Sequence, residues 1–478
     1  MKITKDALIL AQALGGGGGI TPTGNQDITT LNEYDVTDKA TARVSAAERA
    51  KIIPENIKQG ETILGVEGSY SGGGTSAPSN DVNFYDYDGT IVYSYSAADF
   101  ANLSAMPANP THEGLTAQGW NWTLSDAKTY VASYGMLDIG QMYITDDGKT
   151  RLYITIATTG RMSPTLQWSQ TVANGVTIDW GDGSATETAM GAGPQEATHT
   201  YTAVGDYVIT LNPAEGCALI LAASILKTIN YQETDPYRNM LRRVELGSAI
   251  TALGDSCFES SSSLTTITMP SSITSLGMKT LYKCFSLKSI IIPSAVSGSL
   301  YSSFCMNCYS LTSISMPKGI TGIGSFQNAN SLVRITTPNG VTSMGGFNKC
   351  FSLKTVTIPG GMTSIPDNMF YQNYSLEKIT IPSGITEIKD AAFRQCVSLT
   401  KLIFPSGLTS IAGSYVFFAN EGMAIYDFSA CTTVPTLANS TSFQSIPADC
   451  RILVPAALYD TWKAASNWSN YASYIVAV

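Results

Sequence analysis

The second half of the chain repeats one pattern of apolar and polar positions about every 23 residues. Each copy has a leucine, inward apolar residues three and five positions later, and a proline at the sixth position, with Thr337 as the exception. A period of about 20 to 29 residues with this core predicts a leucine-rich-repeat solenoid. We expect eight copies from Leu241, which begins a degenerate first copy, to about Ile411. The seven regular leucines all follow a serine: Leu264, Leu287, Leu311, Leu332, Leu353, Leu376 and Leu399.

The positions two and four residues after each leucine alternate with the inward ones, so we expect their side chains on one outward face. They carry mainly Ser and Thr, with a few cations. The position three residues before the leucine holds a cysteine in four copies and a small or polar residue in the others, which predicts a packing slot. The four cysteines are Cys284, Cys308, Cys350 and Cys396.

The first half follows other patterns. Alternating apolar residues on either side of Asp88–Gly89 predict a hairpin, and a second hairpin is expected around Asp147–Gly148. The glycine run 15–19 predicts a linker or hinge. Helices are expected at 3–14, early in 45–67, from Asp99 to Leu103 and at 124–134, with a strand at 62–66.

Residues 160–212 predict a small β-sandwich, in which the strand and turn VTIDWGDGS precede HTYTAVGDYVITL. This pair resembles the polycystic-kidney-disease (PKD) type of immunoglobulin-like domain. The resemblance is carried by Asp179, Trp180, Gly181, Asp182, Gly183, His199, Tyr201, Gly205 and Tyr207.

The fold class that we predict is therefore multidomain and β-rich, with small N-terminal α/β modules, an immunoglobulin-like sandwich and a C-terminal solenoid closed by a helical cap. The expected divisions are an attachment region at 1–70, a linker at 71–80, an α+β module at 81–159, the sandwich and connector at 160–240, the repeats at 241–411 and the cap at 412–478.

Charge is low, at 14% of residues, and uneven. The net charge is -9, yet residues 241–411 hold 13 basic and 7 acidic side chains, a net of +6. The acidic first half argues against nucleic acid as a partner, and the basic repeats favour an anionic surface. The chain has no apolar run of 18 residues, and its N-terminus is a poor signal peptide, so we expect neither a membrane span nor general secretion.

Motifs for chemistry are scarce, and we predict no enzymatic activity and no cofactor. His112 and His199 lack a recognisable catalytic partner in sequence, which favours structural roles. Cys305 and Cys308 form one C-x-x-C without the second pair of ligands that zinc requires. Calcium binding by Asp179 and Asp182, or by Asp86 and Asp88, stays open, although we favour turn capping for both pairs.

The repeated motif SLxxIxIPxGITxI resembles the BspA-like leucine-rich repeats of bacterial and phage surface proteins. The tail after Cys450, with a strand at 452–454 and a helix containing Trp462 and Trp468, resembles their closing cap. IIPENIKQGETILGVEGSY, at 52–70, and the segment beginning VNFYDYDG resemble modules of phage and prophage tail proteins.

These resemblances imply a phage tail fibre or receptor-binding protein. Its N-terminus would attach to tail or baseplate proteins, and its repeats would bind a glycan or protein of the host cell surface. It would be a homo-oligomer, with a trimer typical of such fibres, located in the virion. The alternative is a bacterial cell-surface adhesin, which would need an export signal. An enzyme acting on cell-wall glycan is a third class, and the repeats hold few acids for it.

A receptor is expected on the outward face and its edges, where hydroxyls, cations and tyrosines suit carbohydrate or protein ligands. The same hydroxyl residues are also ordinary strand formers. The candidate receptor-binding residues are Arg334, Lys354, Lys378, Lys401, Tyr371 and Tyr374.

Overall fold

The computed structural model describes residues 81–221, 225–227, 239–301 and 303–478, together with four short N-terminal strands. Met1–Asn80 and Asp81–Val478 are two compact units. In the first unit, the antiparallel pairs are β1 (Ile28–Thr30) with β2 (Glu33–Tyr34), and β3 (Thr62–Ile63) with β4 (Val66–Glu67). The strand expected at 62–66 is therefore a hairpin, and the helices expected at 3–14 and early in 45–67 lie outside the described residues.

Residues 81–145 form a four-stranded sheet with two helices, which we call the docking module. The strand order is β6-β5-β8-β7, and β5 and β6 form the hairpin expected around Asp88–Gly89. Ser96 and Thr123 cap the two helices through their side chains, and Gly135 ends the second in the left-handed conformation. The elements are β5 (Val82–Tyr85), β6 (Ile91–Tyr95), α3 (Ala97–Ala101), β7 (Leu115–Trp120), α4 (Leu124–Tyr134) and β8 (Leu137–Thr145).

The next segment supplies strands to two sheets that share one hydrophobic core with the repeats. Its strands are β9 (Thr150–Ile156), β10 (Thr165–Gln170), β11 (Val176–Asp179), β12 (Glu187–Ala189), β13 (Gly193–Thr198), β14 (Gly205–Pro213), β15 (Leu219–Leu221) and β16 (Leu226–Lys227). β11 pairs with β14, so the two halves of the WGDGS and HTY motif lie on neighbouring strands. The assignment to the PKD type stays a prediction.

Two expected divisions differ from the structure. β8 and β9 flank the Asp147–Gly148 turn but belong to different sheets, so the second hairpin was wrong and the docking module ends near residue 145 rather than 159. The sandwich and the repeats are not separate cores either. β9 pairs with β17, the first repeat strand, and β15 pairs in parallel with β18. The solenoid therefore continues both sheets and needs no separate cap at this end.

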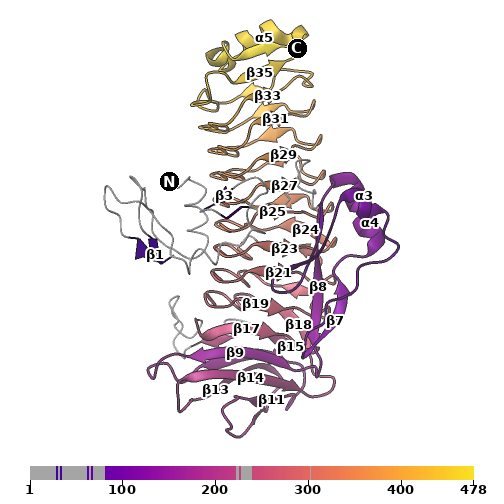
Figure 1. The fold of residues 1–478 in the computed structure, drawn as a ribbon, viewed down its shortest axis with the longest axis vertical. Helices are drawn as coiled ribbons and strands as arrows, with labels where there is room; N and C mark the ends of the chain where they lie inside the picture. Colours follow the sequence, from indigo (N-terminus) through magenta and orange to yellow (C-terminus); the bar gives the residue numbers. More distant parts are fainter. Residues whose placement is uncertain are drawn as a thin grey trace. The chain divides into compact units, whose positions relative to one another are not determined.

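The solenoid is a stack of coils, each with two short strands that pair in parallel with those of neighbouring coils (Figure 1). The first strand of each coil lies two to four residues after the repeat leucine, as the pattern predicts. These first strands are β17 (Leu241–Glu245), β19 (Thr266–Thr268), β21 (Ser289–Ile291), β23 (Ser313–Ser315), β25 (Arg334–Ile335), β27 (Thr355–Thr357), β29 (Lys378–Thr380), β31 (Lys401–Ile403) and β33 (Ile425–Asp427).

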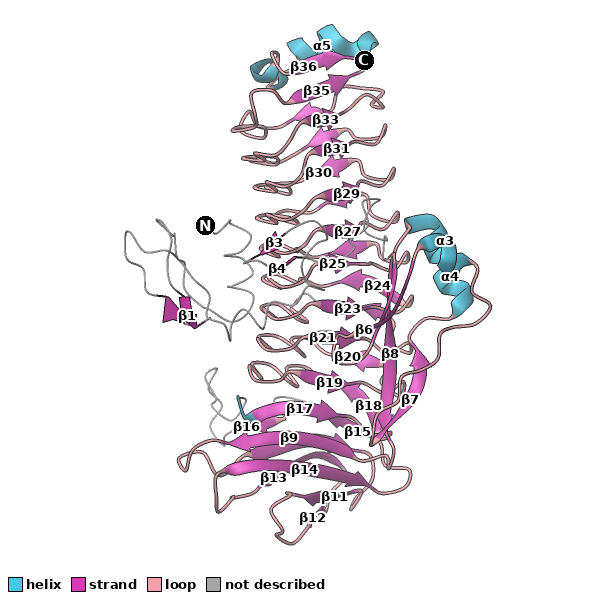
Figure 2. Cartoon of the chain, in the orientation of Figure 1, coloured by secondary structure: helices cyan, strands magenta, loops and turns pink. Residues whose placement is uncertain are grey.

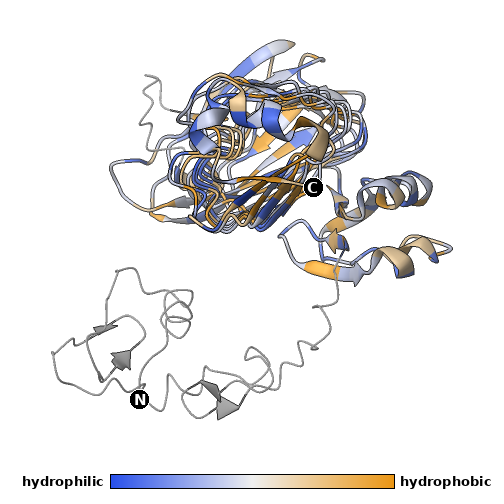
Figure 3. Ribbon diagram, turned by 90° about the horizontal axis from the view of Figure 1, so that it is seen from above, coloured by the Kyte–Doolittle hydropathy of each residue, from blue (hydrophilic) through white to orange (hydrophobic). Residues whose placement is uncertain are grey.

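The second strand of each coil follows the proline. These strands are β18 (Ile250–Leu253), β20 (Ser275–Leu276), β22 (Gly298–Ser299), β24 (Ile320–Ile323), β26 (Ser343–Met344), β28 (Ser364–Ile365), β30 (Glu387–Ile388), β32 (Ser410–Ile411) and β34 (Thr436–Leu437). All the repeat leucines are fully buried. Seen along the stack, the coils overlie one another and the docking module lies beside them (Figure 3).

The C-terminal end matches the expected cap, with more strands than the pattern indicated. The parallel ladder continues from β31 through β33 to β35 (Arg451–Val454) and β36 (Ile475–Ala477), so regular coils extend beyond Ile411. The fully buried Trp462 and Trp468 come from α5 (Tyr459–Ala464) and η4 (Trp468–Tyr471), which follow η3 (Ala456–Leu458). Most helical residues described lie here and in the docking module (Figure 2).

Candidate recognition surface

The docking module covers the first-strand face of the solenoid over β19, β21 and β23, which β8 crosses (Figure 1). A Cβ added at Gly140, in the middle of β8, would lie 2.6 Å from Cγ2 of Ile291 and 3.0 Å from Cβ of Ser315. Only a residue without a side chain permits so close an approach. The outward positions of β21 and β23 are therefore buried, where the sequence predicted a solvent-exposed ribbon.

Side chains of the docking module donate hydrogen bonds to main-chain carbonyls of the solenoid. Asn121 Nδ2 donates to the carbonyl of Ile292 (3.0 Å), and Trp122 Nε1 to that of Met316 (2.8 Å). Tyr130, from α4, donates its hydroxyl to the carbonyl of a third coil. Because these donors are buried, their bonds fix the position of the docking module on the stack.

Arg334 forms a buried ion pair with Asp138 of β8. Its Nη2 lies 2.8 Å from Asp138 Oδ1, and its Nε donates to Oδ2 (3.1 Å). Arg334 Nη2 also donates to the carbonyls of Asp81 and Leu137. Burial raises the pKa of Asp138, and the guanidinium opposes that shift. Arg334 is thus committed to an internal contact, and the expected exposed receptor position at this residue was wrong.

The same face is open beyond the docking module. Lys378 and Lys401, at the register position of Arg334, are exposed on β29 and β31. Lys401 pairs with Asp427 of the next coil at 3.2 Å. Ile403 is 57% exposed beside them. Two candidate residues therefore lie together on an open surface, while Arg334 does not join them.

A row of exposed aromatic side chains follows one edge of the solenoid, at the position two residues before the repeat leucine. We call Phe285, Tyr309, Phe351 and Tyr374 the aromatic row. Their exposure is 36–41%. They stack in two pairs from adjacent coils, with ring centroids 5.0 Å apart for Phe285 and Tyr309 and 5.4 Å for Phe351 and Tyr374. Of this row, only Tyr374 is among the candidates predicted from the sequence, although all four rings share one register position.

The two remaining candidates occupy different surroundings. Lys354 is exposed one residue after its leucine, where it pairs with Glu377 of the next coil at 3.0 Å. Tyr371 is half-buried at another part of the coil, under the guanidinium of Arg394, whose Cζ lies 5.4 Å from the ring centre. The six candidates thus occupy different environments. Arg334 lies in an internal contact, and Lys378 and Lys401 lie on the open strand face. Lys354 and Tyr374 are exposed near the repeat leucine, and Tyr371 packs in a turn.

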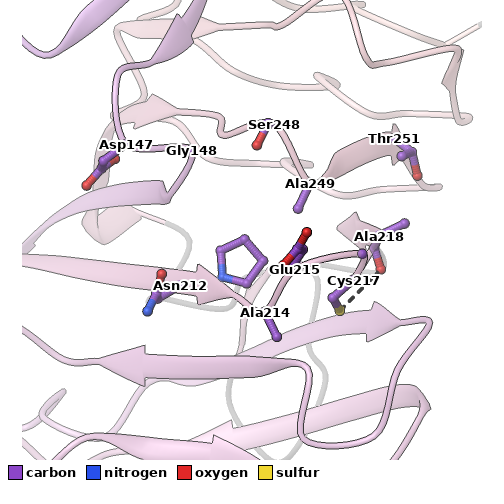
Figure 4. A pocket seen from close by; sticks show the side chains of 12 residues that line it. Asp147, Gly148, Asn212, Ala214, Glu215, Cys217, Ala218, Ser248, Ala249 and Thr251 are labelled. Atoms are coloured by element: carbon purple, nitrogen blue, oxygen red, sulfur yellow. Dashed lines mark hydrogen bonds between the residues drawn. The ribbon is translucent and has the colours of Figure 1, made fainter.

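Among the concave sites where the solenoid meets other described segments, two are large. One, of about 530 Å³, lies between the β5–β6 turn and the outward positions of three coils. The other, of about 440 Å³, lies between the β14–β15 loop and the first coil (Figure 4). In that second pocket Asp147 lies at one edge, apart from Glu215, and the salt bridges to Lys149 and Arg151 already occupy it. Hydrogen bonds to these cations help to hold the pKa of Asp147 at about 2, although burial alone would raise it.

Both histidines are held by aspartates of turns. His112 Nε2 lies 2.7 Å from Asp86 Oδ2, and His199 Nε2 lies 2.7 Å from Asp182 Oδ2. Asp182 also accepts from Ser184, and the hydrogen bonds to Ser184 and His199 hold its pKa at about 2. Asp179 accepts from the N–H of Gly181. These contacts account for the aspartates as turn-capping groups, and the described residues contain no group of three or more metal-binding side chains.

The cysteine slot has the packing role that the pattern predicted. Cys284, Cys308, Cys350 and Cys396 are fully buried, and each thiol donates to a main-chain carbonyl about one coil earlier, at 3.2 Å. Burial raises the pKa of the Cys284 and Cys396 thiols, and it raises that of Cys350 to about 12. Cys305, also fully buried, packs in the same core.

In the part of the chain that the structure describes, no helix combines the length and apolar character needed to cross a membrane. Residues 217–325 and 298–424 match the model of the BspA type leucine rich repeat region. The match begins before Leu241, where β15 already pairs in parallel with β18. No curated protein matches the chain.

Several solved leucine-rich-repeat proteins are similar to part of the chain. One from Bacteroides ovatus is 18% identical with a TM-score of 0.37, covering 59% of this chain and 70% of that one. A leucine-rich cell surface protein from Faecalibacterium prausnitzii is 20% identical with a TM-score of 0.27, covering 54% and 87%. The pneumococcal vaccine antigen PcpA is 15% identical with a TM-score of 0.32, covering 54% and 82%.

Proposed function

We propose that this chain is a recognition protein of a bacterial cell surface, whose BspA-type solenoid attaches to a glycan or protein of another cell. The observation that carries the proposal is the aromatic row. Four large rings at one register position remain exposed in a stack that buries its other repeated apolar positions. The family match of the repeats supports the placement at a bacterial surface.

The aromatic row favours binding because part of each ring stays exposed beside its stacked neighbour. Phe285 and Phe351 have no polar group to offset their exposure, and both lie in consecutive-coil pairs rather than singly. Grouped exposed apolar side chains mark interaction sites more often than scattered ones. Tyr309 and Tyr374 add hydroxyls to rings that are already ordered by stacking, which lowers the entropic cost of binding.

The histidines and thiols, which could otherwise act in catalysis, have structural contacts, and this is consistent with a recognition role. His112 and His199 are each engaged with a turn aspartate, and the thiols described above are buried. The absence of enzymatic activity remains our proposal, since catalysis needs a base placed against a substrate.

The tail-fibre hypothesis stays a prediction. It depends on the modules at 52–70 and 82–145, which the family match to 217–424 does not reach. Trimer formation and attachment to baseplate proteins depend on the same modules. The docking module packs on the solenoid of its own chain, and this contact is compatible with either location.

The test is attachment of the full-length protein to cells. Purified protein is titrated onto bacterial and epithelial cells, and Phe351→Ser with Tyr374→Ser is compared with Tyr301→Ser. Tyr301 is an exposed tyrosine, at 49%, outside the aromatic row. We expect the double variant to weaken attachment at least about tenfold, because each such ring contributes about 1 kcal/mol or more at a binding surface.

The Tyr301→Ser control should attach like the parent protein. Equal attachment by the parent and the double variant, with unchanged melting temperatures, would overturn the role of the aromatic row. Attachment of the parent protein to neither class of cell would overturn the proposed function itself.

A further inference from the structure

The pocket under the β5–β6 turn has a polar lining drawn from two parts of the chain. Tyr87 and Asp88 come from the turn, and Arg243, Thr265, Thr266 and Lys288 come from three successive coils. Its volume of about 530 Å³ falls within the range of about 300 to 1,000 Å³ that is usual for small-molecule sites. A polar lining of this size suits a hydroxylated ligand rather than an apolar one.

The turn that forms the pocket is held rigidly. Gly89 has a φ of 91°, and a Cβ there would lie 3.2 Å from Cβ of Ser289. Asp86, beside it, holds His112 at 2.7 Å. Asp88 Oδ1 accepts from the N–H of Thr90 (2.8 Å). A site whose walls are already fixed loses little entropy on binding.

The two cations of the pocket carry its positive charge. Lys288 is exposed and, among the residues that the structure describes, has no ion-pair partner. It can therefore donate to an anionic group without losing an existing contact. Arg243 binds Glu245 through Nη2 and lies over the ring of Tyr153, and its partly exposed side chain adds positive charge at the wall of the pocket.

We propose that this pocket binds an acidic saccharide, such as a uronic acid unit of an oligosaccharide. Lys288 and Arg243 would receive the sugar carboxylate, since cations bind carboxylates by charge-assisted hydrogen bonds. The hydroxyls of Thr265 and Thr266 and the free oxygen of Asp88 would receive the sugar hydroxyls. Asp88 disfavours a ligand that is anionic throughout, such as a phosphate chain, because it would lie against that charge.

The basic character of the repeats is consistent with this ligand. Residues 241–411 carry a net charge of +6 in a chain of net charge -9, so their field favours acidic partners. The pocket is separate from the aromatic row, and its ligand does not depend on the proposed attachment role.

The test is calorimetric titration of the full-length protein with trigalacturonate, with maltotriose as a neutral trisaccharide and with inorganic phosphate. We expect trigalacturonate to bind and maltotriose to bind at least about tenfold more weakly. Higher salt should lower the affinity for trigalacturonate. Lys288→Gln should reduce trigalacturonate affinity about tenfold. Lys389→Gln, a change at a partly exposed lysine outside the pocket, should leave it unchanged.

Other outcomes would overturn the proposal. Equal binding of trigalacturonate by Lys288→Gln and the parent places the ligand elsewhere, and equal binding of maltotriose removes the need for a carboxylate. Inorganic phosphate that binds as tightly and competes with trigalacturonate would reduce the site to a simple anion site. Absence of any heat at millimolar trigalacturonate, with cell attachment intact, would reject the pocket while leaving the proposed function standing.

Discussion

The two halves of the solenoid's first-strand face have the same repeat pattern and different surroundings. Under the docking module, the outward residues of β21 and β23 are Ser289, Ile291, Ser313 and Ser315, and all four are buried. Beyond it, β29 and β31 present exposed outward side chains. Apart from Thr337, the inward positions are apolar on both sides of this boundary, so the main difference lies in what faces outward.

The outward side chains of the covered coils are accommodated by the docking module. Gly140 of β8 allows the close approach to Ile291 and Ser315, and Asp138 pairs with the guanidinium of Arg334. In the open part Lys378 and Lys401 extend into solvent. The covered half holds another part of the chain, and the open half and the edges are left for other partners.

Removing the cation from the covered half should have the largest effect. Arg334→Ala leaves the carboxylate of Asp138 buried without its partner, which costs about 3–5 kcal/mol. We expect amide hydrogen exchange in β8 to accelerate by at least on the order of a hundredfold, since each 1.4 kcal/mol is a factor of about ten. Lys378→Ala, at the same register position in the open half, should change exchange there by less than about twofold.

A second variant separates the ion pair from packing. Replacing both partners, as Arg334→Met with Asp138→Leu, should restore most of the protection, because two apolar groups leave no charge unpaired. Equal exchange in Arg334→Ala and the parent would show that the docking module does not depend on this pair.

Filling the close approach of β8 to the solenoid at Gly140 should have the next largest effect. Gly140→Val places side-chain atoms where Ile291 and Ser315 already lie, and overpacking of this kind costs about 1–3 kcal/mol. We expect a lower melting temperature and faster exchange in β8 and α4. Gly160→Val is the control, because a Cβ there meets nothing within 4 Å. A melting temperature that falls equally in both variants would contradict the close approach.

The repeat could be predicted in detail from the sequence because its signal is local and recurs. The Ser-Leu pair, the inward alternation and the proline fix the strand position in every regular coil, and the cysteine slot follows from the same register. Helix 124–134 was predicted with its observed bounds, since Thr123 and Gly135 mark its two ends. The hairpin expected at Asp147–Gly148 failed because a turn does not reveal which sheet each flanking strand joins.

The surface could not be predicted as well, since it depends on contacts between distant segments. Arg334 meets a residue 196 positions earlier in the chain, and no repeat pattern records that pairing. The pocket at Lys288 likewise forms only when the β5–β6 turn lies against three coils. The aromatic row, by contrast, was accessible from the sequence, through the shared register of Phe285, Tyr309, Phe351 and Tyr374.

A neutral hydrogen bond across the covered interface should matter less than the ion pair. Tyr130→Phe removes the hydroxyl that donates to the carbonyl of Thr337 (2.6 Å) and keeps the ring in place. We expect a loss of about 1 kcal/mol, measured as exchange of α4 and β8, because a single neutral hydrogen bond contributes about that much. Tyr134→Phe, whose hydroxyl accepts only a long contact from Gly360 (3.4 Å), should lose less. The reverse order would place the main contact of α4 at Tyr134.

The smallest effect is expected in the open half, where Lys401 pairs with Asp427 at the surface. Burial alone would raise the pKa of Asp427, but hydrogen bonds from Ser429 and Lys401 lower it. A lowered pKa in the folded state adds stability above the unfolded pKa of about 3.9, and that stability is lost as pH falls through the folded pKa. Lys401→Ala should therefore lower the free energy of unfolding by under about 1 kcal/mol at pH 7. It should cause no measurable loss at a pH low enough to protonate Asp427. Thermal melts at the two pH values compare these losses. Ser429→Ala removes a hydroxyl that donates to Asp427 Oδ1 (2.6 Å), so it should likewise lower the stability at pH 7 and not once Asp427 is protonated. An equal loss at both pH values in either variant would contradict the role of Asp427.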